Sequence, residues 1–275
     1  MIVAIASMKG GVGKTTISAM LARHIADQVQ APVTIIDMDP QRGSTVLLLG
    51  PKAAVTVEPP TIADILASEL EDIPSTEVFA QSLRKSPYNE NIMVVPAHPE
   101  LTDFMNNDVP VDVLRWAIEA SPLSEESIVI IDTGSAPSLC EMSVAAADIV
   151  FIPITMSHQS GVPTTNTMKA ALVHGTTIGG IIPVMSGEAG WEIDQLDKWR
   201  EKMKASEALR SMGVRVLANI PYSRQIIRGR WRWGKLPDRM LPTLQEMYGR
   251  MFGLEGMVPG EIEEENVLAG AVEQV

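Results

Sequence analysis

The stretch that decides the fold is Ser7-Met8-Lys9-Gly10-Gly11-Val12-Gly13-Lys14-Thr15-Thr16. It follows an apolar run at residues 2–6 that predicts a buried strand, and it leads into a helical pattern that begins at Lys14. A glycine-rich turn between a strand and a helix points backbone N–H groups and a helix N-terminus at an anion. The stretch therefore predicts a phosphate-binding loop, in which residues 9–16 all contact the nucleotide.

Two side chains of this loop carry the groups that binding a nucleoside triphosphate with Mg²⁺ requires. Lys14 is placed to neutralise the β- and γ-phosphates, and the Thr15 hydroxyl is placed to bind Mg²⁺. Met8 stands where the strict phosphate-loop pattern has its first glycine, so the match is incomplete by one position. A glycine-rich turn with a purely structural role is the alternative. The strand, loop and helix context favours ATP and Mg²⁺ as ligands.

Lys9 is the second informative lysine, five positions before Lys14. Taken together, the letters KGGVGKTT resemble the deviant Walker A motif of the ParA/MinD family of ATPases. The resemblance implies that ATP is buried in a sandwich dimer, in which Lys9 reaches the phosphates held by the partner subunit. A lysine that simply faces solvent is the alternative. The resemblance thus assigns Lys9, Lys14 and an acidic residue to catalysis.

Acidic residues follow two of the other predicted strands. Asp37-Met38-Asp39-Pro40-Gln41 resembles the D-x-D-P-Q segment of the ParA branch, which implies that Asp39 orients the attacking water and that Asp37 lies nearer the metal. Residues 128–131 followed by Asp132 read as a Walker B strand with a Mg²⁺-binding carboxylate. Turn or cap aspartates are the alternative. The chain continues Thr-Gly-Ser-Ala-Pro where the family usually has a proline-rich loop, so the second switch loop departs from the pattern.

Short apolar runs alternate with helical patterns along most of the chain. The alternation predicts a doubly wound, mostly parallel α/β sheet with helices on both faces, of the P-loop NTPase, deviant Walker A type. We expect one ATPase domain over residues 1–258, an acidic and flexible tail over 259–275, and surface excursions at 50–60 and 71–91. The predicted strands are residues 2–6, 33–36, 92–95, 128–131, 149–154, 181–185 and 214–218, and the predicted helices are 14–29, 61–70, 111–120, 161–173, 192–212 and 241–251.

The charge is unevenly distributed. The net charge is −12, yet residues 197–250 hold 13 of the 22 Lys and Arg and only 5 of the 34 Asp and Glu. Within that segment, five cations and two tryptophans crowd into residues 224–235, which predicts sequence-independent contacts with DNA phosphates. The alternative for this segment is that a tryptophan is buried as an anchor and that the arginines bond to the protein itself. For residues 198–210 we prefer the interpretation that the charges form a solvated helix face. The predicted DNA contacts are Arg224, Arg228, Arg230, Arg232 and Lys235.

Other branches of the family fit less well. The acidic tail opposes a basic membrane-binding helix, and the single Cys140 opposes a shared metal cluster, so we expect that thiol to be a small buried apolar group. A helix-turn-helix segment before the loop is not expected, which corresponds to the short form of ParA. Pro221 and Tyr222 resemble the late turn that frames adenine; a simple strand end is the equal alternative.

The sequence thus predicts a ParA-type DNA-partitioning ATPase in the cytoplasm, associated with the nucleoid and not with membrane. The resemblance implies Mg²⁺-dependent hydrolysis of ATP that is slow until a centromere-binding adaptor stimulates it. An ATP-dependent homodimer then binds non-specific DNA to segregate a plasmid or chromosome. Two alternatives within the family remain open: an ATPase that positions a protein cargo on the nucleoid, and a nucleotide-gated scaffold with little turnover. A biosynthetic P-loop ligase is a third possibility, which D-x-D-P-Q and Lys9 oppose.

Overall fold

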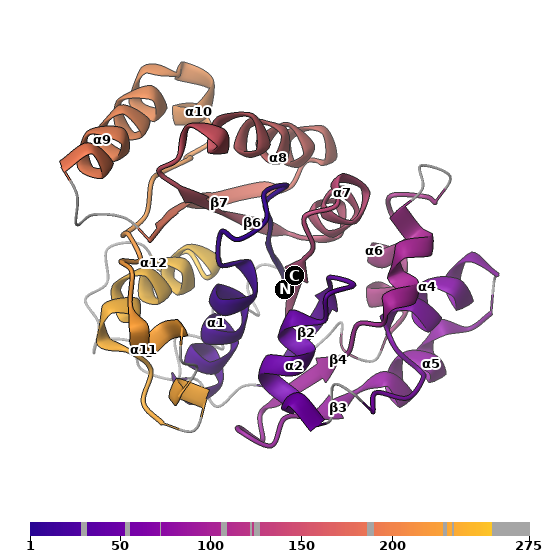
Figure 1. The fold of residues 1–275 in the computed structure, drawn as a ribbon. Coiled ribbons are helices and arrows are strands. Elements are labelled where there is room, and N and C mark those ends of the chain that lie inside the picture. Colours follow the sequence, from indigo (N-terminus) through magenta and orange to yellow (C-terminus); the bar gives the residue numbers. More distant parts are fainter. Residues whose placement is uncertain are drawn as a thin grey trace.

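The computed structural model describes residues 1–28, 32–52, 56–71, 73–105, 109–121, 123, 127–185, 190–227, 230–232 and 234–254. Within these ranges, seven strands form one sheet in the order β3-β4-β2-β5-β1-β6-β7 (Figure 1). Every neighbouring pair is parallel except β3 and β4, which are antiparallel. The strands are β1 (Ile2–Ile5), β2 (Val33–Met38), β3 (Arg84–Lys85), β4 (Ile92–Val95), β5 (Ile128–Thr133), β6 (Ile149–Thr155) and β7 (Thr177–Val184).

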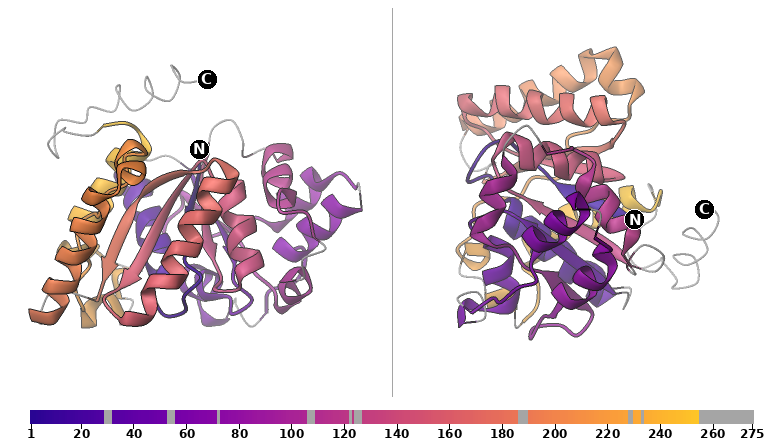
Figure 2. Two further views of the ribbon diagram at one scale, coloured as in Figure 1. Left: turned by 90° about the horizontal axis from the view of Figure 1, so that it is seen from above. Right: turned by 90° about the vertical axis from the view of Figure 1, so that its right-hand side faces the viewer.

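Helices cover both faces of the sheet (Figure 2). On β1, Val3 and Ile5 pack into a core with α1, α2 and α12, whereas Ile2 and Ala4 pack into a core with α4, α6, α7 and α8. This alternation along one strand follows from side chains that point to opposite faces of a pleated sheet. The helices of the first core are α1 (Lys14–Gln28), α2 (Gly43–Leu49) and α12 (Leu241–Met251); those of the second are α4 (Ile62–Leu70), α6 (Val113–Ala120), α7 (Pro137–Ala146) and α8 (Gly161–His174).

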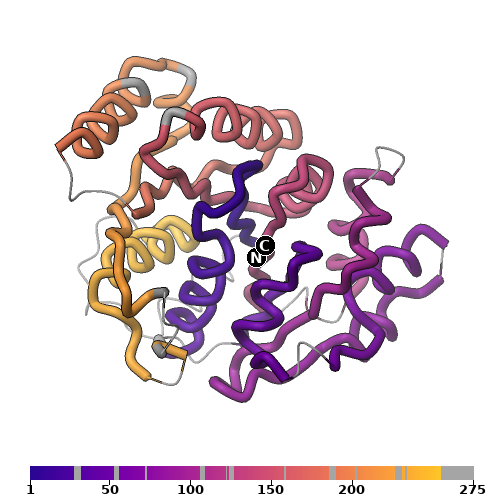
Figure 3. Tube along the Cα trace, in the orientation of Figure 1, coloured from indigo at the N-terminus to yellow at the C-terminus, as the bar shows by residue number. Residues whose placement is uncertain are grey.

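Further helices lie toward the two sides of the molecule (Figure 1). Helices α4 and α5 lie at the right of the view in Figure 1, and α9 and α10 lie at its upper left, beside α8. The N-terminal segment runs through the middle between them (Figure 3), which puts the glycine-rich loop near the centre of the molecule. These elements are α5 (Ser75–Ser82), η1 (Pro99–Met105), η2 (His158–Ser160), α9 (Gly190–Ala205), α10 (Glu207–Ser211), α11 (Arg224–Ile227), η3 (Arg230–Arg232) and η4 (Asp238–Met240).

The sheet confirms the predicted doubly wound, mostly parallel fold, with four local corrections. Residues 71–91 are not only a surface excursion, because they contain α5 and β3. Residues 214–218 form no strand; isolated bridges to β7 hold Val216 and Ile220 instead. The helix predicted over 192–212 is divided between α9 and α10. Helices α2 and α7 were not predicted from the sequence. The predicted tail at 259–275 lies outside the described residues, and the single ATPase domain over 1–258 stays a prediction.

Gly179 lies in β7 where that strand packs closely on β6. A Cβ atom at Gly179 would lie 2.6 Å from Cε1 of Phe151 and 2.8 Å from Cδ1 of Ile149. Both neighbours are buried, so neither has room to withdraw. We expect Gly179→Ala to lower the free energy of unfolding by about 1–3 kcal/mol, the usual cost of overpacking a core. Chemical denaturation measures it. Gly190→Ala is the control, because its Cβ would meet nothing within 4 Å, and an equal loss in both variants would contradict the prediction.

Candidate nucleotide site

The glycine-rich loop joins the carboxyl end of β1 to the first turn of α1. Gly11 and Gly13 have φ angles of 72° and 83°, in the left-handed region that favours glycine. Between them, the side chain of Val12 is buried in the core and anchors the loop. In the part of the chain that the structure describes, the amides of residues 10–13 donate no hydrogen bond to protein. They are therefore available to phosphate oxygens.

Lys14 begins α1 and is buried, with 7% of its surface exposed. Its ammonium donates a hydrogen bond to the carbonyl oxygen of Lys9 at 3.1 Å, so it lies inside the turn of the loop. Burial lowers the pKa of Lys14, although the nearby charges of Asp132 and Asp39 act in the opposite direction. The loop thus holds an incompletely solvated cation, which an anionic ligand would stabilise.

Lys9 lies at the other end of the loop and points to a different part of the fold. Its ammonium donates hydrogen bonds to three hydroxyl groups: Thr155 at 2.9 Å, Ser157 at 2.5 Å and Ser160 at 2.9 Å. Thr155 ends β6, and Ser160 directly precedes α8. In this single subunit the two lysines are therefore separated, and the contact of Lys9 with a partner's phosphates stays a prediction.

Asp37 and Asp132 lie side by side at the carboxyl ends of β2 and β5, where they pair in register. Both side chains are fully buried. Burial, reinforced for Asp37 by the charge of Asp132, raises the pKa of both carboxyl groups. Asp132 accepts hydrogen bonds from the hydroxyls of Ser44 at 2.7 Å and Ser18 at 3.3 Å, and hydrogen bonding to Thr15 also stabilises its ionised form.

Asp37 is held by the turn that leads into α2. One carboxylate oxygen accepts bonds from the amide of Thr45 at 2.8 Å and its hydroxyl at 2.7 Å; the other accepts from the amide of Asp39 at 3.2 Å. The Thr45 hydroxyl also accepts a bond from the amide of Ala97 at 3.0 Å. These donors fix Asp37 rigidly, which places it well to support a metal but leaves its direct ligation a prediction.

The donor set fits Mg²⁺. Two adjacent buried carboxylates and the Thr15 hydroxyl are hard oxygen donors, and burial raises the pKa of both carboxyl groups even though the nearby charge of Lys14 lowers that of Asp132. The described residues contain no group of three or more His, Cys, Asp or Glu side chains that could hold a metal. The arrangement therefore suits an ion that also binds phosphate oxygens and water, as Mg²⁺ usually does.

Asp39 is half-buried at the start of the turn after β2, and its carboxylate accepts a bond from the amide of Gln41 at 2.9 Å. The loop after β5 packs directly against it. A Cβ atom on Gly134 would lie 3.2 Å from the Met38 carbonyl oxygen and 3.6 Å from Cγ of Asp39. Glycine at this position lets the two loops approach each other, which gives a structural reason for the departure of the second switch loop from the family pattern.

Tyr222 and Arg224 line one cavity of about 330 Å³, together with Ser223, Gln225 and Arg239. The preceding residue, Pro221, follows the bridge that joins Ile220 to the carboxyl end of β7. Tyr222 is 52% exposed, so its ring is accessible. The structure therefore places one predicted adenine residue and one predicted DNA residue in the same wall, and both roles stay predictions.

The basic segment is partly tied to the protein. Trp231 is buried, and its indole N–H donates to the carbonyl oxygen of Ile226 at 3.2 Å, so this tryptophan is an anchor. Arg232 donates to the carbonyl oxygen of Leu47 at 3.2 Å and lies 5.5 Å from the centroid of the Tyr88 ring. The exposed Lys235 pairs with Asp238 at 3.2 Å. Arg228 lies outside the described residues, as does the side chain of Arg230.

Sequence reasoning missed six hydroxyl residues of the site, one of which is Ser18, a donor to Asp132. Ser44 and Thr45 bind the two buried aspartates, and their only signal was their place directly after the Asp-Pro-Gln turn. The contacts of the other three with Lys9 left no local signal, because they are far from the loop in sequence. These three are Thr155, Ser157 and Ser160.

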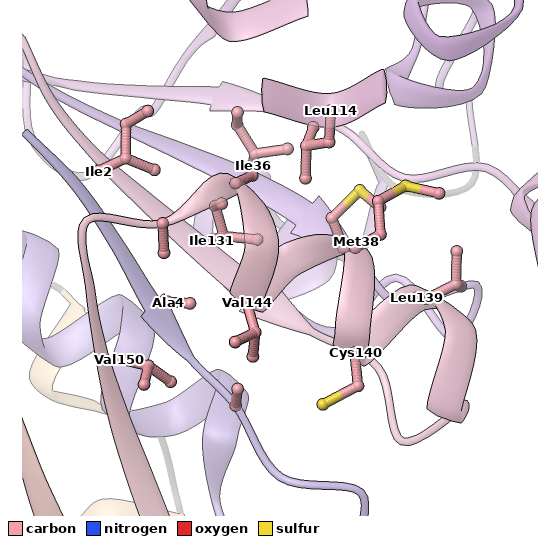
Figure 4. Close-up of a cluster of buried hydrophobic side chains, with 14 of the residues drawn as sticks. Ile2, Ala4, Ile36, Met38, Leu114, Ile131, Leu139, Cys140, Val144 and Val150 are labelled. Atoms are coloured by element: carbon pink, nitrogen blue, oxygen red, sulfur yellow. The ribbon is translucent and has the colours of Figure 1, made fainter. Parts of the chain in front are cut away.

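Cys140 belongs to α7 and is fully buried among apolar side chains (Figure 4), which confirms the expectation of a small apolar group. Burial raises the pKa of its thiol to about 11, so it stays protonated and unreactive at neutral pH. Among the described residues, no helix is both long and apolar enough to cross a membrane.

The sequence profile of the AAA domain family matches residues 1–170, which is more than half of the chain. The chain belongs to this family. This AAA domain protein is 33% identical over 159 residues to the chromosome partitioning protein ParA of Myxococcus xanthus (strain DK1622). The match covers 56% of this chain and 51% of that relative, so the chain spans about half the length of the curated relative it matches. The similarity supports the ParA resemblance drawn from the motifs.

Solved structures share the fold of this AAA domain protein. The ATP complex of a Cyanothece McdA variant is 20% identical, has a TM-score of 0.72, and matches over 94% of this chain and 98% of the other. Cobyrinic acid a,c-diamide synthase from Mycobacterium smegmatis is 18% identical, with a TM-score of 0.67 over 93% of this chain and 95% of the other. At these identities the likeness establishes the fold alone. One of the two proteins that share the fold is a biosynthetic enzyme.

Proposed function

We propose that the chain is a ParA-type DNA-partitioning ATPase. It binds ATP with Mg²⁺, forms a homodimer around the nucleotide, and holds non-specific DNA until hydrolysis resets it. A centromere-binding adaptor stimulates that hydrolysis, and the protein acts on the nucleoid in the cytoplasm. The proposal rests on the resemblance of the motifs and on the similarity to the Myxococcus ParA over about half of that relative.

One observation carries this proposal more than any other: the glycine-rich loop has a lysine at each end, and only one of them points into the loop. Lys14 is buried beside the loop carbonyl, where it serves the nucleotide of its own subunit. Lys9 extends away from that position and is held by hydroxyls of β6 and the segment after it. A second cation at the mouth of a phosphate site, directed elsewhere, suits a contact with a second subunit.

The chain's own residues then perform the following roles. The amides of residues 10–13 bind phosphate oxygens, and Lys14 and Lys9 stabilise the negative charge of the transferring γ-phosphoryl group. Asp39 accepts a hydrogen bond from the attacking water and orients it. Thr15 would hold Mg²⁺, with Asp132 and Asp37 supporting it from the ends of β5 and β2. When bound, Mg²⁺ supplies neutralisation of charge on the phosphate oxygens.

The proposal is tested by sedimentation with and without ATP and Mg²⁺, in the presence of random-sequence DNA. We expect a dimer only with ATP, and DNA co-sedimenting only with the dimer. Arg224→Ala/Lys235→Ala removes two exposed cations from the predicted DNA surface and leaves the bracing Arg232 in place. The double variant is expected to dimerise normally and to lose DNA.

Salt dependence makes this test quantitative. Each phosphate contact contributes about 0.9 to the slope of log affinity against log salt concentration, and each substitution counts twice in a dimer. The slope is therefore expected to fall by about 3–4. The matched control is Lys198→Ala/Lys204→Ala, which removes the same charge from α9. Equal losses in both double variants would show a general charge effect and would contradict the assigned surface.

The shared fold of the diamide synthase gives a specific reason to test a second function, ATP-dependent ligation. A ligase would consume ATP only with its carboxylate substrate, and neither ATP nor DNA would change its oligomeric state in the way proposed. A monomer that stays monomeric with ATP, and that ignores DNA, would favour the ligase and overturn the partition ATPase.

A further inference from the structure

Thr155, Ser157 and Ser160 form a hydroxyl cluster around the ammonium group of Lys9. Their oxygens lie within 2.9–3.2 Å of one another. An ammonium group has three N–H donors, and each of these three is matched by one hydroxyl acceptor. The cluster therefore satisfies every hydrogen bond that Lys9 can donate, without any contribution from nucleotide.

The surrounding structure fixes the cluster in place. Ser160 is buried, and its carbonyl oxygen accepts a bond from the Thr164 hydroxyl at 2.7 Å, within the first turn of α8. The loop is attached to the same helix, because the amide of Met8 donates to the Thr167 hydroxyl at 3.3 Å. Ser160 and the loop that carries Lys9 are thus both attached to α8, which holds them at a fixed place relative to each other.

The cluster binds a cation but does not neutralise it. In the described part of the chain, no carboxylate forms an ion pair with Lys9, and its hydrogen-bond partners are all neutral hydroxyls. The N-terminus of α8 begins at Gly161, and its partial positive charge disfavours an ammonium nearby. A phosphate oxygen offers both a hydrogen bond and a negative charge, so it competes favourably for the same ammonium.

We infer that the hydroxyl cluster is a docking site for Lys9 within its own subunit, and that ATP-dependent dimerisation requires Lys9 to leave it. This inference rests on the proposed function, because it takes Lys9 to act across the dimer. The three hydroxyl residues are then positioning residues that set how readily the dimer forms. They restrain the free subunit and do not touch the reacting atoms.

The docking of Lys9 has a large effect on the dissociation constant of the dimer, because the dimer contains two copies of Lys9. Suppose that Lys9 is released from the hydroxyl cluster in a fraction f of the subunits. A partner that binds only this fraction has an apparent dissociation constant that is larger than the intrinsic one by a factor of 1/f. A symmetric dimer needs Lys9 released from both subunits, so its dissociation constant scales as 1/f². If about one subunit in ten is released at equilibrium, the cluster weakens the dimer about a hundredfold.

The test uses the full-length chain with Thr155→Val, Ser157→Ala and Ser160→Ala combined. Sedimentation with ATP and Mg²⁺ is expected to give a dimer dissociation constant roughly ten- to a hundredfold lower than that of the unsubstituted chain. Thr165→Val is the matched control, because among the described residues its hydroxyl bonds to the Gly161 carbonyl oxygen on the same helix and not to Lys9, so it should change nothing. An unchanged or weaker dimer in a folded triple variant overturns the inference. Ser157→Ala alone, at an exposed position, gives a smaller shift in the same direction if the triple variant does not fold.

A second measurement is independent of the dimer. Without nucleotide, the amine of Lys9 is acylated with an amine-specific reagent, and the rate is measured by peptide mass spectrometry against the exposed Lys204 in the same chain. The triple variant is expected to raise the relative rate about tenfold, since the docked amine is protected. An unchanged rate overturns the docking site even if dimers form. Failure of ATP to form any dimer overturns the proposed function, while this rate still decides the docking contact.

Discussion

Replacing Asp39 by alanine is expected to lower the rate of ATP hydrolysis by about 10²–10⁴-fold, the usual contribution of a positioned side chain that hydrogen-bonds to the nucleophile. ATP binding should change little, because the amides of the loop and Lys14 hold the phosphates. The ATP-bound dimer should therefore accumulate, and with it the DNA-bound form. Single-turnover kinetics and sedimentation with DNA measure the two effects separately.

Asp197→Ala is the control for Asp39, since it removes an equal charge from an exposed pair with Arg200 in α9. Normal turnover in Asp39→Ala would remove Asp39 from its catalytic role. A joint loss of hydrolysis and ATP binding would also contradict it, because Asp39 would then support the fold of the loop. Gly134 makes this second outcome testable: it contacts the same turn, and Gly134→Ala disturbs that turn without removing the carboxylate.

Replacing Lys14 by alanine is expected to weaken ATP binding by about a hundredfold or more, because hydrogen bonds to charged groups contribute roughly 1.5–3 kcal/mol each and at least two are lost. The nucleotide-free protein should keep its thermal midpoint or gain slightly. The reason is that burial lowers the pKa of Lys14, so the ammonium is held in the free protein at a cost that ATP relieves. Titration calorimetry and thermal unfolding measure the two quantities.

Lys204→Ala is the matched control for Lys14, since its amine is exposed and pairs with Glu201 at 3.1 Å. Retained ATP binding in Lys14→Ala would contradict the assignment of the loop. A marked fall in the thermal midpoint without nucleotide would show instead that Lys14 serves the fold, through its bond to the Lys9 carbonyl oxygen.

The sequence predicted the sheet well because its strands carry strong local signals. β2, β4 and β5 are runs of apolar residues buried on both faces, which is the pattern of central parallel strands. Helix α2 was not predicted, because its seven residues are too few to show a helical period. The Val214–Ala218 stretch has strand-like composition, but only isolated bridges join this part of the chain to β7.

The candidate site likewise contains residues that could be predicted from the sequence and contacts that could not. The residue types and spacing of the loop and of the three aspartates were visible in sequence, because motifs encode them locally. The bonds from Lys9 to Thr155 and Ser160 were not, since 146 and 151 positions separate the partners in the chain. Tertiary packing alone creates such contacts. The same holds for Arg232, whose bond to the Leu47 carbonyl oxygen spans 185 positions.

The hydroxyl group of Thr45 connects two segments that are far apart in the sequence. Its hydroxyl donates to Asp37 at the end of β2 and accepts from the amide of Ala97, just before η1. A rearrangement of Asp37 must therefore either carry the chain around Ala97 with it or break a buried hydrogen bond. The carboxyl end of β2 and the chain that leads into η1 are thus mechanically coupled through a single buried hydroxyl group.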